Sequence, residues 1–197
     1  MKLVKFNIIA LILFSSWMSV AQQLPQFTQY MYNTISINPA YAGSRETLSV
    51  VGLHRSQWVG LEKGPQTQTL SVHAPLKNER VGLGLSFIND ELGYQNFSYL
   101  YGDFSYTIPT GETSKLAFGI KAGFTSFSLD SGFQQDLSDD AVIFGFENRW
   151  KPNIGAGLYW HSQKWYLGLS APRILNTDYT GDAEFQALER VGYYFTG

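Results

Sequence analysis

The three histidines are the residues of this sequence best suited to catalysis, and they lie in separate segments. His73 follows two positions after Ser71, so a candidate base and a candidate nucleophile share one face of an extended segment. Serine-type hydrolysis needs a nucleophile, a base and an orienting acid at one point, often with the serine in a G-x-S-x-G turn. His54 and His161 belong to other segments, and no such turn occurs. We interpret the histidines as interior or rim residues and predict no catalytic residue and no enzyme.

An acidic stretch between residues 130 and 140 is the strongest candidate for a metal site. It holds aspartates at positions 130, 136, 139 and 140, and calcium prefers clustered oxygen ligands. The spacing does not match an EF-hand loop, because Gly132 comes too early. The chain has no cysteine, so disulfides and thiolate metal sites are excluded. We predict a solvated acidic loop, with no metal and no cofactor.

The best candidate for a binding site is the INPAYAGSR stretch at residues 37–45. Asn38, Pro39, Tyr41 and Gly43 could form a rigid turn that presents the tyrosine to a partner protein. The same residues could instead pack the N-terminal segment against the rest of the molecule. The pattern alone leaves both interpretations open. For the longer segment 22–44 we expect a short helical turn and an ordered loop, placed at the end of the main fold or inside it.

The elements that position these residues are predicted to be β-strands, and residues 115–129 carry the clearest pattern. One set of alternate positions is apolar throughout, namely Leu116, Phe118, Ile120, Ala122 and Phe124. The other set is small or polar, with Lys121 in mid-strand. A tilted strand needs roughly 9–11 residues to cross a bilayer, and this segment is long enough. Lipid on one face and a polar interior on the other explain the alternation, although a strand of a soluble sandwich has the same pattern.

Composition and loop lengths favour the membrane interpretation. Only 15% of the residues are charged, 16% are aromatic, and the net charge of −2 offers nucleic acid no basic surface. The predicted connections alternate between short and long, with a longer loop expected at residues 89–96, as in outer-membrane barrels. Trp58, Trp150, Trp160 and Trp165 are interpreted as interface-belt aromatics. The mid-strand charges Asp103 and Lys121 must then face inward. We predict an all-β, antiparallel up-and-down transmembrane barrel contacting outer-membrane lipid.

The N-terminus has the features of a secretory signal peptide. Lys2 and Lys5 flank the start of an apolar run at residues 6–14, and small residues precede a cleavage site expected after Ala21. The predicted organisation is a signal peptide at 1–21, an ordered N-terminal segment at 22–46 and the barrel at 47–197. About eight strands are expected, and the last has no closing turn, so we expect a C-terminally incomplete barrel.

Three stretches carry a resemblance to a known family. They are PQFTQYM at 25–31 leading into INPAYAGS at 37–44, RSQWVG at 55–60, and PQTQTLSVHAPL at 65–76 followed by VGLG at 81–84. In these motifs the chain resembles the PorP/SprF family of Bacteroidetes outer-membrane proteins, which serve type IX secretion and gliding motility.

The resemblance implies a non-enzymatic β-barrel of the outer membrane with no family catalytic residue to carry over. Its expected partners are secreted cell-surface proteins and other components of the secretion system. Two other functions remain open on the sequence. One is a passive outer-membrane porin or transporter, and the other is a secreted carbohydrate-binding β-sandwich.

Overall fold

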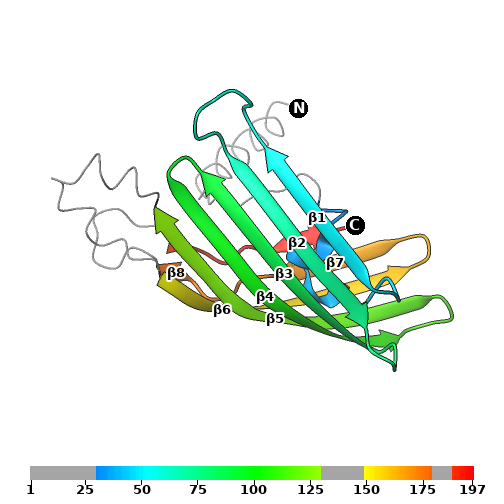
Figure 1. The fold of residues 1–197 in the computed structure, drawn as a ribbon. Helices are drawn as coiled ribbons and strands as arrows, with labels where there is room; N and C mark the ends of the chain where they lie inside the picture. The colour runs from blue at the N-terminus through cyan, green and yellow to red at the C-terminus, as the bar shows by residue number, and fades with distance from the viewer. Residues whose placement is uncertain (1–29, 130–148, 179–187) are drawn as a thin grey trace, which may run out of the picture.

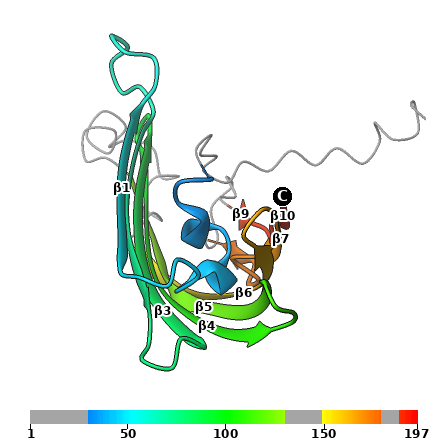
Figure 2. The same ribbon diagram turned by 90° about the vertical axis from the view of Figure 1, so that its right-hand side faces the viewer.

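The computed structural model describes residues 30–129, 149–178 and 188–197, and within them the fold is dominated by one curved antiparallel sheet of eight strands. The sheet has the order β1-β2-β3-β4-β5-β6-β7-β10. Its strands are β1 (Ser49–Ser56), β2 (Gln66–Pro75), β3 (Val81–Leu92), β4 (Gln95–Pro109), β5 (Ser114–Leu129), β6 (Arg149–Ser162), β7 (Tyr166–Ala171) and β10 (Tyr194–Thr196). The long strands lie obliquely side by side and curve into a half-barrel (Figures 1 and 2). The predicted all-β, up-and-down fold is therefore confirmed, as an open half-barrel.

The remaining elements are short. β8 (Thr177–Asp178) and β9 (Leu188–Glu189) pair only with each other. Two 3-10 helices, η2 (Thr34–Ser36) and η3 (Pro39–Tyr41), precede β1. None of the helices in the described ranges has the length and apolar character needed to cross a membrane.

The two faces of the sheet differ as the alternation in β5 predicts. Phe118, Ile120 and Phe124 lie on the convex face, where they are 44%, 61% and 50% exposed. Lys121 and Thr125 lie on the concave face and are buried. Within the described residues no second layer covers the convex side (Figure 2). Apolar side chains that point away from the molecule are the pattern of a lipid-facing strand, and a soluble sandwich does not account for them.

Two tryptophans of β6 mark the height of the apolar surface. Trp150 and Trp160 share the convex face ten residues apart. The alternate positions between them on that face all carry apolar side chains. Ten residues of strand cover roughly 33 Å, and a tilt of about 40° reduces this to about 25 Å, the height of an outer-membrane apolar band. Trp165 packs against Trp160 with their ring centroids 4.9 Å apart. Trp58, by contrast, lies in the β1–β2 loop beyond the strands.

One predicted loop is wrong. Residues 89–96 belong mostly to β3 and β4, which continue to Leu92 and from Gln95 and leave only Gly93 and Tyr94 as a turn. Gly93 has a φ of 62°, a conformation that glycine adopts without strain. The polar residues before it pair across the hairpin. The ends of a membrane strand that extend beyond the apolar band can carry polar side chains. The polar composition of residues 89–96 therefore indicated a loop where the two strands in fact continue.

The turns at residues 76–80, 110–113 and 163–165 lie at one end of the sheet, here called the short-turn end. The β1–β2 loop at residues 57–65 lies at the opposite end, together with the two-residue β3–β4 turn at Gly93 and Tyr94. The acidic stretch at 130–140 and the predicted signal peptide both fall outside the described residues.

Candidate functional site on the concave face

Residues 33–46, here called the inner strap, cross the hollow of the half-barrel (Figure 2) and contain the whole of the predicted binding motif at residues 37–45. Its local shape follows from the sequence. The Asn38 carboxamide caps η3 by accepting a hydrogen bond of 3.0 Å from the Ala40 amide. Pro39 occupies the first helical position, where its missing N–H costs nothing. Gly43 has a φ of 74° and turns the chain toward β1.

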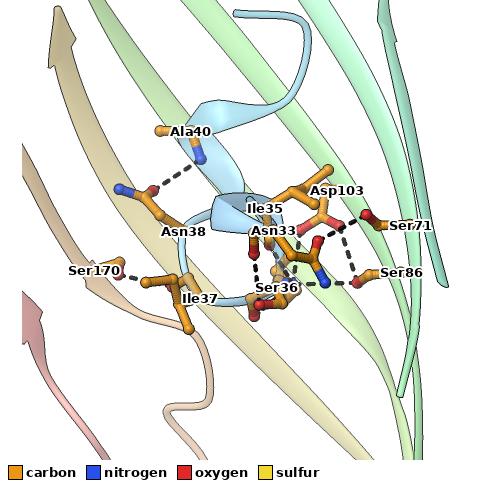
Figure 3. A network of polar contacts seen from close by, with 11 residues as sticks. Asn33, Ile35, Ser36, Ile37, Asn38, Ala40, Ser71, Ser86, Asp103 and Ser170 are labelled. Atoms are coloured by element: carbon orange, nitrogen blue, oxygen red, sulfur yellow. Dashed lines mark hydrogen bonds and ion pairs between the residues drawn. The ribbon is translucent and has the colours of Figure 1, made fainter. Parts of the chain in front are cut away.

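The first attachment of the strap is to β2 through Asn33. Its carboxamide donates to Oγ1 of Thr69 at 3.1 Å. It also accepts from Oγ of Ser71 at 2.7 Å, as Figure 3 shows. All three side chains are buried. The Ser71 hydroxyl therefore donates to a carboxamide oxygen, and among the described residues it forms no hydrogen bond with a histidine.

The second attachment is to β6 and β7. Ser170 of β7 donates its hydroxyl to the Ile37 carbonyl at 2.8 Å. The Asn38 carboxamide donates to the Leu158 carbonyl of β6 at 2.9 Å. Because β2 and β7 are five places apart in the sheet, the strap is held on both sides of the hollow.

Between these attachments lies a buried ion pair. The Lys121 ammonium on β5 is 3.1 Å from an Asp103 carboxylate oxygen on β4, and the two side chains are 2% and 0% exposed. The same ammonium donates to the carbonyls of Ile35 and Ser36 at 3.0 and 3.3 Å. Buried charges are tolerated when they are paired and hydrogen-bonded. Here two carbonyls of the strap supply hydrogen bonds that water would otherwise make to the ammonium. The prediction that both charges face inward is confirmed.

The C-terminal part of the strap contacts β4 and β2. Ser105 donates to the Ala42 carbonyl at 2.6 Å, and the Gly43 amide donates to Nδ1 of His73 at 3.1 Å. A ring nitrogen that accepts a hydrogen bond carries no proton, so the proton of a neutral His73 lies on Nε2. The Tyr41 ring meets His73 edge to face, with centroids 5.4 Å apart. His73 is thus a structural partner of the strap.

Glycines form the surface on which the strap rests. A Cβ built on Gly119 would overlap the backbone of Pro39 and Ala40, and one on Gly82 would overlap the Ala42 carbonyl. A Cβ on Gly157 would meet the Asn38 carboxamide. The glycine-rich inner face that the sequence shows is therefore explained by close backbone approach.

At the short-turn end the strap emerges toward solvent. Arg45 and Glu46 are exposed, and Arg45 donates through Nε to the Tyr41 hydroxyl at 2.9 Å. Glu46 pairs with Lys115, and this hydrogen bond and charge lower the pKa of the Glu46 carboxyl. Such an exposed pair adds little stability. This surface, formed by Tyr41, Arg45, Glu46 and Lys115, is called the rim.

The structure places the predicted site residues at different depths. Asn38 and Pro39 are buried against the sheet, whereas Tyr41 and Gly43 are half-buried at the start of the rim. Partner binding by these four residues stays a prediction, and Ala21 lies outside the described residues. Sequence reasoning missed Asn33, Ser105 and Ser170. Small polar residues on the predicted inner faces were the available signal.

The geometry defines a class of protein. Oblique antiparallel strands with an apolar outer face, a polar inner face and tryptophans at both ends of the band are the architecture of an outer-membrane β-barrel. The chain belongs to the family described as type IX secretion system membrane protein PorP/SprF, whose family model matches residues 19–197. The resemblance seen in the three motifs is confirmed. No curated protein and no solved structure matches the chain.

Membership makes the protein a component of type IX secretion. The family is one of secretion-system membrane proteins and is not an enzyme family.

Proposed function

We propose that the protein is an outer-membrane adaptor of type IX secretion, exported with the help of its N-terminal signal peptide. Its role would be to bind secreted cell-surface proteins or periplasmic secretion components by direct contact. The observation that carries the location is the convex face of β5, whose large apolar side chains lie exposed while the opposite face buries a charge. Lipid is the environment that stabilises such a face.

The rim is the part of the predicted site best placed for a partner. In outer-membrane barrels the short turns face the periplasm and the longer loops face outward. The rim lies at the end where all three turns have five residues or fewer, opposite the nine-residue β1–β2 loop, so it would face secretion components in the periplasm. Arg45 and Glu46 are exposed there, next to the half-buried ring of Tyr41. The buried part of the strap fixes the position of these side chains, so little entropy would be lost on binding.

Site-specific photo-crosslinking in living cells tests this proposal. A photoreactive residue at Arg45 should form an adduct with a secretion component or a secreted surface protein. The same residue at Lys77, in the turn at 76–80 of the same end, is the matched control and should form much less. Placed at Ile120 it should crosslink to lipid. Equal adducts at positions 45 and 77 in secreting cells would count against a partner site at the rim.

A further inference from the structure

We propose that the inner strap is a plug that keeps the interior of the barrel closed to ions. The first argument is its path. The strap is fixed to β2 through Asn33 and to β7 through the Ile37 carbonyl, so it crosses the width of the half-barrel. Figure 2 shows it within the hollow, with the sheet curving around it.

The second argument is that a further stretch of the chain shares the hollow with the strap. After β7 the chain turns inward, and Asn153 of β6 holds this return by accepting from the amides of Ile174 and Leu175 at 3.2 and 3.0 Å. One cavity of about 30 Å³ lies between this return, the strap and the sheet, with Ser36, Lys121 and Arg173 in its lining. That volume holds one or two water molecules, and a conducting channel needs a continuous column of water.

The third argument is the way the strap is held. Side chains of the sheet donate to its backbone carbonyls at Ile35, Ser36, Ile37 and Ala42. The Lys121 ammonium makes two of these contacts while it is paired with Asp103. Removing the ammonium removes the most central attachment, and it leaves the outer face of the sheet unchanged.

The test is conductance of the full-length protein in planar lipid bilayers. The wild-type protein should show no stable current. Lys121→Met combined with Asp103→Asn should show discrete openings, with a mean current at least tenfold above that of the wild type. Lys77→Met removes a lysine from an exposed turn and serves as the control, which should stay closed.

A second readout reports the strap itself. The chain has no cysteine, so an Ala42→Cys substitution introduces a single thiol at a buried strap position. A water-soluble maleimide should label it in the double variant and spare it in the otherwise wild-type protein.

A strap replaced at residues 35–41 by a glycine–serine linker of equal length provides an independent open form, its folding checked by heat-modifiable migration. Openings in that folded form support the plug, whereas a closed folded linker form overturns it. Stable current through the Ala42→Cys protein while its thiol stays unlabelled overturns it as well, because the strap is then in place and ions still pass. None of these outcomes depends on whether the rim binds a partner.

Discussion

Asp103 and Lys121 are register partners on neighbouring strands, and their side chains form a 3.1 Å ion pair directly beneath the inner strap. The pair connects the wall of the half-barrel with the inner strap. It neutralises two charges in the wall of the half-barrel, and it directs ammonium protons at the carbonyls of Ile35 and Ser36. The stability of the wall and the position of the strap are therefore coupled through Lys121.

The coupling predicts a non-additive response to substitution. Lys121→Met should lower the free energy of unfolding by about 3–5 kcal/mol, because it leaves the Asp103 carboxylate buried and unpaired. Adding Asp103→Asn should recover part of that loss, since no lone charge remains. Urea unfolding in lipid vesicles, followed by tryptophan fluorescence, measures both. Equal losses in the single and the double variant would show that the ion pair does not carry the effect.

Gly119→Ala should loosen the strap although it adds one methyl group. The new Cβ would overlap the backbone of Pro39 and Ala40, and overpacking of this kind costs about 1–3 kcal/mol. Gly102→Ala on the neighbouring strand is the matched control. A Cβ there meets only the Ala122 carbonyl, at 3.9 Å, at an exposed outer position, and it should change stability by less than about 0.5 kcal/mol. Identical unfolding curves for the two variants would contradict the close contact.

Asn38→Ala should destabilise the strap by about 1–3 kcal/mol. The substitution removes the buried cap of η3 and the part-buried hydrogen bond to the Leu158 carbonyl. Gln163→Ala, in an exposed turn, is the control for loss of an amide. Faster hydrogen exchange of the Ala40 and Ala42 amides in the Asn38 variant alone is the expected result. Unchanged protection of those amides would exclude the capping role.

Ile120→Arg should impair insertion into the outer membrane. A cation on the lipid face near the bilayer midplane costs about 2–4 kcal/mol. Leu61→Arg lies in the β1–β2 loop, beyond the strands, and should be tolerated. The amount of heat-modifiable protein in the outer-membrane fraction gives the comparison. Normal levels of the Ile120 variant would indicate that this side chain does not meet hydrocarbon.

β5 was predictable because one of its faces points outward and the other packs against the strap. Side chains of a strand alternate between the two faces, so the difference appears in the sequence as a period of two. The inward direction of Lys121 followed from the cost of a charge in lipid. The β3–β4 hairpin was mispredicted, since the ends of both strands are polar and only Gly93 marks the turn.

The site was predictable only in part. The capping residue and the turn at Gly43 are local features, and the sequence indicates them. The contacts of Asn33 with Ser71 and of Lys121 with Ile35 join residues 38 and 86 positions apart. Nothing in a period or a motif specifies such pairs, because each depends on how far the sheet curves around the strap.

A spin-label scan of residues 116–124 in lipid vesicles tests the central claim most directly. With the wild-type chain free of cysteine, each position can carry one label. If the convex face of β5 meets hydrocarbon, labels at Phe118, Ile120 and Phe124 will relax with dissolved oxygen and resist a water-soluble nickel complex. Labels at the odd-numbered positions 117–123, which lie on the concave face, will be shielded from both reagents. Free access of the nickel complex to Ile120, or the absence of a period of two, would contradict the membrane-barrel account.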